Sequence, residues 1–189
     1  MGDGMELIGG VEKRVIIIVN YDAAWPRHFE VEKGKIDQVL ADVPHRVAHV
    51  GSTALMGLAA KPIVDLQLSV PDVEAEGSYL PSLESAGYVL RARERAHRML
   101  RTPALDVHVH VCSIGSDWER RHLLFRDWLR ESEADRAKYA EVKKALASED
   151  WPSINHYADA KSGIIAEITS RAEKWAEMTG WSQENSSPN

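Results

Sequence analysis

The sequence contains one cysteine, Cys112, among 189 residues. One thiol can form neither an intrachain disulfide nor a zinc site built from several cysteines, which is typical of a protein in a reducing compartment. No apolar run approaches the ~18 residues that a transmembrane helix requires, and residues 1–10 lack the charged and apolar segments of a signal peptide. We therefore expect a cytoplasmic protein with no membrane partner.

Basic residues are also scarce. The 23 Lys and Arg residues are outnumbered by 29 Asp and Glu residues, so the formal net charge is −6. A surface that binds nucleic acids in general needs an excess of Lys and Arg, so the composition argues against that function and still allows a local basic pocket. Nothing in the composition indicates the oligomeric state.

The chain is long enough for one well-buried core, with 44% hydrophobic residues. We expect a single domain over residues 14–178, between a flexible N-terminus (1–13) and a flexible tail (179–189). Strands and helices are both predicted up to about residue 115, and helices alone from about residue 116. The expected fold class is α/β (α+β), with the helical portion packed directly on the sheet.

The individual elements follow from the spacing of apolar residues. Strands are expected at 14–19, 46–50, 63–70, 88–93, 98–101 and 106–112, and helices at 25–41, 73–86, 117–130, 133–147 and 155–178. The clearest strand is 106–112, in which valine alternates with aspartate and histidine.

The most informative stretch is His49–Val70, where a short apolar strand runs into Gly51-Ser52-Thr53. Glycine allows a tight turn and a close approach to a ligand, and hydroxyls with exposed N–H groups can hold an anion. The alternative is a polar turn in which a hydroxyl caps a helix. Lys61 precedes the next strand and would either neutralise phosphate or be solvated.

One acid, Asp65, interrupts the apolar strand 63–70. Because side chains alternate between the faces of a strand, Asp65 and Gln67 share one face. Burying an acid is costly unless it is paired or bound to a metal, so this face should border a cleft or be covered by partners. Alternatively, Asp65 accepts hydrogen bonds from backbone N–H groups.

His108 and His110 share one face of strand 106–112. Two histidines so placed can hold a metal ion, or supply one ligand and one general base; alternatively they belong to a solvated outer face. If this strand lies beside that of Asp65, the polar faces merge into one cluster. Arg126 and Lys161, on predicted helices, could clamp an anionic substrate or form salt bridges with nearby acids.

Together these residues resemble the GrpB-like family. The resemblance extends over roughly residues 14–176 and is carried by YDAAWPRHFE, HVGSTALMGLAAKPIVDLQLSV, HVHV, RRHLLFRDWLR and YADAK. Members are small bacterial proteins, sometimes fused to dephospho-coenzyme A kinase, and are grouped with the nucleotidyltransferase superfamily of DNA polymerase β type. The resemblance implies a nucleotidyltransferase-type mixed β-sheet with flanking helices and a C-terminal helical portion that covers the site.

The sequence departs from the superfamily pattern, which has Gly-Ser, then an acid, an apolar residue and a second acid, with a third acid on a later strand. Gly51-Ser52 and Asp65 match, but Gln67 occupies the second position, and His108 or His110 the third. Two-metal chemistry needs carboxylates to hold Mg²⁺ ions. One carboxylate with histidines suits a single Zn²⁺ or Mn²⁺ ion better.

We therefore expect a protein that binds a nucleoside triphosphate or another phosphate-bearing small molecule, and transfers a nucleotidyl or related group with one divalent metal ion (Mg, Mn or Zn). Asp65, His108 and His110 are the expected catalytic residues and metal ligands. The expected substrate-binding residues are Gly51, Ser52, Thr53, Lys61, Gln67, Arg126 and Lys161. The alternatives are a non-catalytic ligand-binding or accessory module, favoured by Gln67, and a different group-transfer enzyme of specialised metabolism on the same fold.

Overall fold

The structure is a computed structural model that describes residues 5–13 and 15–186. Its strands are β1 (Glu6–Leu7), β2 (Arg46–Val50), β3 (Val64–Val70), β4 (Val89–Glu94), β5 (His97–Arg101) and β6 (Val107–Ser113). Its α-helices are α1 (Trp25–Val39), α2 (Leu80–Ser85), α3 (Asp117–Glu131), α4 (Glu133–Ala147), α5 (Ile154–Ala160) and α6 (Ser162–Thr179). None of the helices in the described ranges is long and apolar enough to cross a membrane.

The six strands of the described residues form one sheet in the order β1-β4-β5-β6-β3-β2. β3 and β6 are parallel neighbours, whereas β2, β4 and β5 pair antiparallel with their neighbours, so the sheet is mixed. In the β3–β6 register Asp65 lies opposite His108, and Gln67 lies opposite His110. The expected α+β fold class is confirmed, and so is the expectation that the Asp65 and histidine strands are neighbours.

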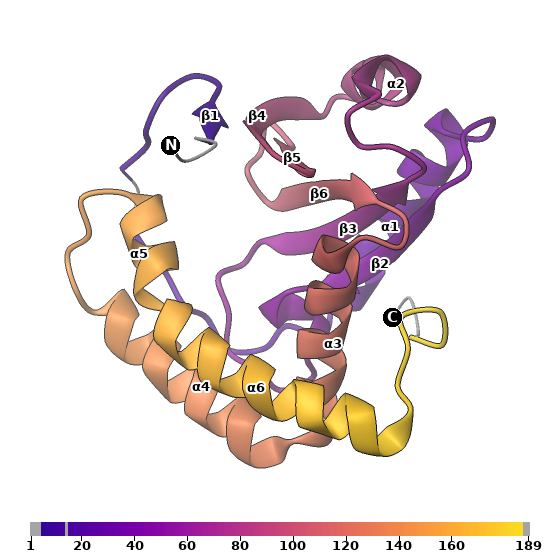
Figure 1. Cartoon of the computed structure of the whole chain (residues 1–189). Coiled ribbons are helices and arrows are strands. Elements are labelled where there is room, and N and C mark those ends of the chain that lie inside the picture. The colour runs from indigo at the N-terminus through magenta and orange to yellow at the C-terminus, as the bar shows by residue number, and fades with distance from the viewer. Residues whose placement is uncertain (1–4, 14, 187–189) are drawn as a thin grey trace.

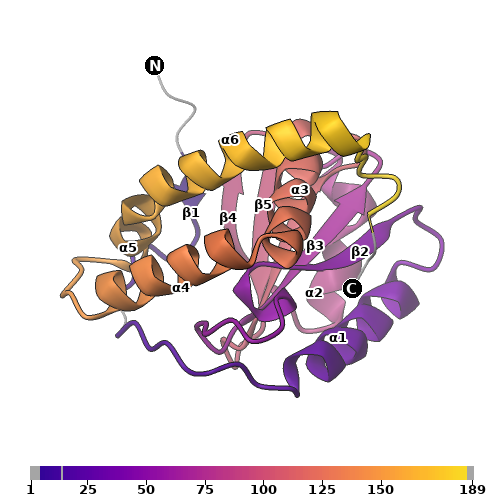
Figure 2. The same ribbon diagram turned by 90° about the horizontal axis from the view of Figure 1, so that it is seen from below.

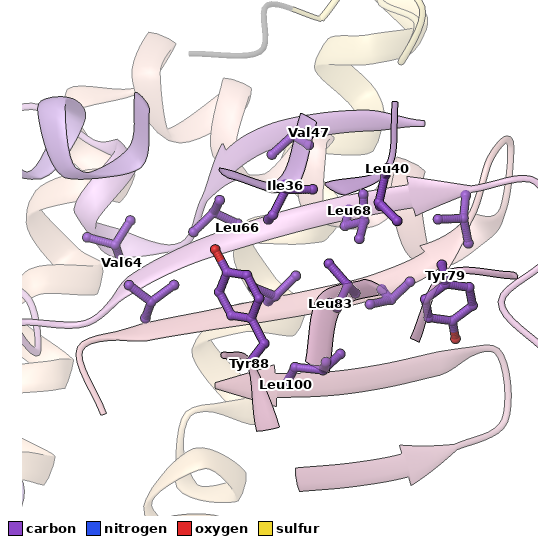
Figure 3. Packing of buried hydrophobic residues seen from close by; sticks show 14 of the residues in the cluster. Ile36, Leu40, Val47, Val64, Leu66, Leu68, Tyr79, Leu83, Tyr88 and Leu100 are labelled. Atoms are coloured by element: carbon purple, nitrogen blue, oxygen red, sulfur yellow. The ribbon is translucent and has the colours of Figure 1, made fainter. Parts of the chain in front are cut away.

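One face of the sheet carries the main apolar core. Figure 3 shows Ile36 of α1, Leu40 directly after that helix and Leu83 of α2 with Leu66 and Leu68 of β3, all in one buried cluster. Helices α3, α4 and α6 lie on the opposite face, the one that carries Asp65, with α4 and α6 side by side (Figures 1 and 2). The polar side chains of β3 and β6 therefore lie between the sheet and a layer of helices.

A smaller apolar cluster joins the helical layer to the loop after β2. Leu55 and Leu58 of that loop pack with Leu129 of α3, Tyr139 of α4 and Ile168 of α6. Since the loop begins at the Gly51 turn, this packing fixes the turn against the helices. Helix α3 also contacts β2 and β6, so the expectation that the helical portion packs directly on the sheet is confirmed.

The strand expected at 14–19 is wrong over the part that is described; Arg14 lies outside the described residues. Val15 and Ile17 are 85% and 57% exposed, and only an isolated bridge joins Val19 to Ala60. The outer strand is instead Glu6–Leu7, which pairs with β4, so part of the segment expected to be flexible belongs to the sheet. A β-branched run forms a strand only where it pairs with a neighbouring strand, and residues 15–18 pair with none of the described strands.

Two expected helices differ from the structure. The helix expected at 73–86 is reduced to a 3₁₀ turn at Glu76–Ser78 and to α2, because Pro81 can occupy only the first turn of a helix. The helix expected at 155–178 is two helices, α5 and α6, which meet at Lys161.

The tail expected to be flexible from residue 179 packs against α3 as far as it is described. The Trp181 Nε1 donates to Asp127 Oδ2 at 3.0 Å, and the Ser186 hydroxyl donates to the same oxygen at 2.5 Å. The Trp181 ring also packs against the Leu123 cluster. These contacts depend on long-range packing that a polar tail sequence does not reveal.

Candidate functional site

The turn after β2 passes directly beside Asp65. Gly51 has φ = +70°, a conformation that favours glycine, and a Cβ at this position would lie 2.5 Å from Asp65 Oδ2. Residues Ser52–Ala54 then form one 3₁₀ turn. The buried Thr53 hydroxyl lies 3.0 Å from His49 Nε2, which ties the turn to the end of β2. Glycine is thus required here both for the backbone conformation and for the missing side chain.

Asp65, His108 and His110 form a compact cluster. Asp65 Oδ1 lies 3.2 Å from His108 Nδ1 and 3.5 Å from His110 Nε2, and the three side chains are 18% to 28% exposed. Burial by itself would raise the pKa of the Asp65 carboxyl, but hydrogen bonds and positive charge from the two histidines outweigh it and hold the pKa well below 3.8. Asp65 is therefore a carboxylate at neutral pH.

His110 is oriented by a hydrogen-bonded chain that the sequence analysis missed. His97 Nε2 lies 3.0 Å from His110 Nδ1, and His97 Nδ1 lies 2.6 Å from Glu94 Oε1. The His97 ring also stacks on Trp118, with centroids 4.4 Å apart. Burial, and after it the charge of neighbouring histidines, lowers the pKa of His97 to about 2, so its imidazole is neutral.

The single proton of His97 determines how His110 is oriented. If His97 donates from Nδ1 to the Glu94 carboxylate, its Nε2 must accept a hydrogen bond from His110 Nδ1–H. His110 Nε2 then faces the Asp65 carboxylate, and only a cation between them, either a proton or a metal ion, makes that pairing favourable. The site therefore fits a metal ion on chemical grounds.

The ligand set has a clear metal preference. The donor atoms of Asp65, His108 and His110 all lie within 4.8 Å of one another. Two imidazoles and one carboxylate are typical ligands of Zn²⁺, and also suit Mn²⁺, whereas Mg²⁺ prefers oxygen ligands. A single Zn²⁺ or Mn²⁺ ion therefore fits this ligand set better than Mg²⁺ does.

A buried lysine of α4, which the sequence analysis did not single out, reaches the Gly51 turn. Lys143 is 3% exposed, and its Nζ donates to Ser52 Oγ at 2.8 Å and to the carbonyl of Ala59 at 2.7 Å. Burial, and then the charges of Lys161 and Lys61, lower the pKa of Lys143 to about 7. In the sequence Lys143 is one of an adjacent pair of helical lysines, and its spacing of four from the buried Tyr139 is the one signal that it points inward.

Lys61 and Lys161 lie nearby, both close to one aromatic ring. Their Nζ atoms are 5.4 Å and 4.8 Å from the centroid of Tyr157. Burial, and then the charge of Lys61, lowers the pKa of Lys161 to about 8. Both lysines were predicted from the sequence, and the structure brings them together with Lys143.

These groups surround one cavity of about 250 Å³, which we call the lysine cavity. It is lined by Ile18, Gly51, Ser52, Thr53, Ala60, Lys61, Ile63, Asp65, His108, His110, Tyr139, Lys143, Tyr157 and Lys161. Three ammonium groups thus lie around the turn, with the Asp65 cluster on the sheet side. An acidic protein carries a strongly basic pocket at the place where the sequence predicted an anion site.

Two residues expected to bind substrate lie outside the lysine cavity. Gln67 is 1% exposed and lines a separate cavity with Glu119 and Leu123 of α3. Helix α3 covers that part of the sheet, so Gln67 shares a face with Asp65 but not a cavity. The Arg126 guanidinium donates to the carbonyl of His49 at 2.9 Å, and Arg126 lines the neighbouring cavity between α3 and α6 instead of the lysine cavity.

Comparison with known proteins agrees with the resemblance seen in the sequence. The family model "GrpB protein" matches residues 15–171. The chain is 48% identical over 169 residues to "UPF0157 protein SCO7215" of Streptomyces coelicolor. The aligned region covers 89% of this chain and 90% of that protein. The chain is also 26% identical over 200 residues to "Dephospho-CoA kinase" of Mycolicibacterium paratuberculosis. That alignment covers only 49% of the longer protein.

A solved structure supports the same assignment. The crystal structure of conserved protein GrpB from Enterococcus faecalis superposes with a TM-score of 0.74 and 32% sequence identity, over 85% of this chain and 99% of that one. Since the family model matches most of the chain and the fold agrees, this chain belongs to the GrpB family.

Proposed function

We propose that this protein binds a nucleotide or another phosphate-bearing small molecule in the lysine cavity, with one divalent metal ion held by Asp65, His108 and His110. The observation that carries the proposal is the convergence of Lys61, Lys143 and Lys161 on a cavity that also contains the Gly51 turn and the Asp65 cluster. Phosphate oxygens would occupy the space between the lysines and the turn.

Electrostatics support an anionic ligand. Burial, and then the charges of Lys161 and Lys61, lower the pKa of Lys143 to about 7, so the positive charges of the three lysines repel one another. Such an arrangement reduces the stability of the empty protein and is typical of a functional site. A phosphate group would offset the repulsion and accept hydrogen bonds from the ammonium groups.

The same cavity offers groups for transfer chemistry. A bound divalent ion would neutralise charge on the phosphate and polarise its P–O bonds. The lysines would hold the phosphate oxygens, and the oxygen of an attacking hydroxyl group would bond to the α-phosphorus while the bond to the bridging oxygen breaks and pyrophosphate leaves. The Asp65 carboxylate would accept the hydroxyl proton. We propose transfer of a nucleotidyl or related group on this basis, and the name of the longer dephospho-CoA kinase relative favours a nucleotide-containing ligand.

A second candidate function is ligand binding without transfer. Gln67 occupies the position of the second acid and is buried under α3, outside the lysine cavity. A second metal ion therefore has no carboxylate there to hold it. A binding or accessory module would retain the lysine cavity and need only the single metal site.

Calorimetry and thermal unfolding would test the proposal with inorganic tripolyphosphate and ATP, each with and without Zn²⁺, Mn²⁺ or Mg²⁺. A ligand present at about 100 times its Kd should stabilise the protein by about 2.7 kcal/mol. Lys143→Met should lose most of this effect, whereas Lys144→Met, which changes an exposed neighbour on the same helix, should retain it. If neither anion shifts the unfolding temperature under any of these conditions, the proposal is wrong.

A further inference from the structure

We infer that a second, larger cavity beside the lysine cavity binds the ring-bearing end of the same phosphate compound, so that the ligand class is a nucleotide and not a simple phosphate. The inference rests on the proposed function, because it needs a phosphate group in the lysine cavity. The second cavity has a volume of about 730 Å³ and lies between α3 and α6, over the Gly51 turn. We call it the ring cavity.

The two cavities are continuous at the turn. Gly51, Ser52 and Tyr139 line both of them. The Ser52 hydroxyl, which accepts a hydrogen bond from Lys143, thus lies at the boundary between the basic cavity and the larger one. One molecule could place its phosphates among the lysines and extend past Ser52 into the ring cavity.

The walls of the ring cavity suit a flat ring. Leu55, Phe125 and Ile165 provide apolar surface, and Phe125 meets Tyr139 edge to face, with centroids 5.5 Å apart at 83°. An aromatic wall binds another ring by stacking and by burial of apolar surface. The volume also lies within the range of ~300–1,000 Å³ that is common for small-molecule sites.

Helix α6 presents a separate face to this cavity. The lining positions of α6 recur once per helical turn and so share one face; they are Ser162, Ile165, Ala166, Thr169, Ser170 and Glu173. The buried core residues of α6, Ile164, Ile168 and Ala172, form a different stripe. Small side chains at Ala166 and Ser170 leave room in the cavity, and both are exposed, so this side is open to a ligand.

The rim supplies hydrogen-bonding groups. Thr169 and Ser170 offer hydroxyls, and Glu173 offers a carboxylate that accepts a hydrogen bond from Arg120 Nη1 at 2.7 Å. Three basic side chains of α3 also line this cavity, those of Arg121, His122 and Arg126. An apolar aromatic pocket with a few polar groups at its edge is suited to a heterocycle that carries exocyclic amino or carbonyl groups. A nucleobase has this chemistry, and inorganic polyphosphate lacks it.

The test compares the affinities of inorganic tripolyphosphate and of the four nucleoside triphosphates for the full chain by calorimetry. At least one nucleotide should bind about tenfold tighter than tripolyphosphate, although its charge is lower. Ala166→Trp would fill the ring cavity and should remove this difference, while the affinity for tripolyphosphate stays unchanged. Ser170→Trp is a second variant on the same face, and Ala137→Trp, at an exposed position of α4 that lines neither cavity, is the matched control.

The outcomes separate this inference from the function on which it rests. If tripolyphosphate binds and Lys143→Met abolishes that binding, but no nucleotide binds more tightly, the ring cavity is not a ligand site and the proposed function stands. Nucleotide affinity that Ala166→Trp and Ser170→Trp both leave intact would also overturn the inference. If neither tripolyphosphate nor any nucleotide binds, the proposed function fails and the inference fails with it.

Discussion

The backbone of Gly51 and the carboxylate of Asp65 lie so close together that no side chain fits between them. A Cβ on residue 51 would stand 2.5 Å from Asp65 Oδ2, and the φ angle of +70° is one that other residues rarely adopt. Val50, the residue before the turn, lies opposite Asp65 in the β2–β3 register. The strand pairing thus brings the turn over the acid, and the glycine allows it to remain there.

Gly51→Ala should therefore impair both the fold and the site. The alanine must either displace the Asp65 carboxylate or shift the turn, so we expect reduced binding of Zn²⁺ and of tripolyphosphate in addition to a lower free energy of unfolding. Gly57→Ala is the matched control, because Gly57 has φ = +77° but nothing within 4 Å of its added Cβ. It should lose about 1–2 kcal/mol from backbone strain alone. Equal losses in urea unfolding, with metal binding retained in both variants, would contradict this account.

Asp65→Asn should abolish binding of Zn²⁺ and Mn²⁺ and preserve the fold. Asparagine is nearly isosteric and keeps neutral hydrogen bonds, but it lacks the charge that a metal ligand needs. Titration calorimetry with each ion and a thermal unfolding curve would be recorded on the same protein. Asp106→Asn is the control, because Asp106 lies just before β6 and outside the metal cluster. A destabilised Asp65→Asn protein with unchanged metal and phosphate affinity would assign Asp65 to the scaffold.

His97→Phe should weaken metal binding without direct loss of a ligand. Phenylalanine can retain the stack on Trp118 but cannot accept the hydrogen bond from His110 Nδ1. Loss of such a supporting partner commonly lowers metal affinity by about 10- to 100-fold. His97→Asn, which can still form a hydrogen bond, should recover part of the affinity. If His97→Phe changes only the unfolding temperature, His97 has a packing role alone.

The affinity for tripolyphosphate should fall as the pH rises through about 7, the pKa of Lys143 in the empty protein. The protonated ammonium attracts the anion, and deprotonation removes that attraction. Lys143→Met should bind more weakly at low pH and show a flatter pH profile, whereas Lys144→Met should follow the unchanged protein. An affinity that is independent of pH between about 6 and 9 in the unchanged protein would refute the assignment.

Folding stability should respond to the same group in the opposite direction. The pKa of Lys143 is lowered from 10.5 to about 7, so between these values the unfolded chain binds the proton that the folded chain has lost. Stability then rises with pH over this range, by up to about 1.4 kcal/mol per pH unit. Urea unfolding of the unchanged protein and of Lys143→Met at several pH values would measure the difference. If both proteins change in parallel with pH, Lys143 keeps an ordinary pKa.

Gln67→Asp should destabilise the protein without creating a Mg²⁺ site. Gln67 is buried under α3, and within residues 5–13 and 15–186 its Oε1 has no hydrogen-bond partner. A carboxylate there would be an unpaired buried charge, with a loss on the order of 3 kcal/mol. Gln67→Asn has the same shape without the charge and should lose less. Tight Mg²⁺ binding by Gln67→Asp would instead mean that position 67 does reach the metal site.

The sequence by itself determined which side chains of β3 and β6 share a face. Alternation is a property of the extended backbone, so Asp65 could be placed on one face with Gln67, and His108 on one face with His110, before any contact was known. The parallel pairing of β3 with β6 is what joins the two sets. The tight turn at Gly51 was predicted for a similarly local reason, because the backbone freedom of glycine does not depend on distant residues. The helices α1, α3 and α4 were also located correctly from their apolar spacing.

Only the tertiary structure decided what covers that polar face. Gln67 and Asp65 have the same orientation on β3, yet α3 buries one and the lysine cavity receives the other. Lys143 joins the site because α4 packs against the loop after β2, and its spacing of four from Tyr139 indicated only that it points inward, not which segment it meets. Backbone periodicity acts over a few residues, whereas the cover of a sheet face depends on contacts between segments far apart in the chain, which a local pattern does not encode.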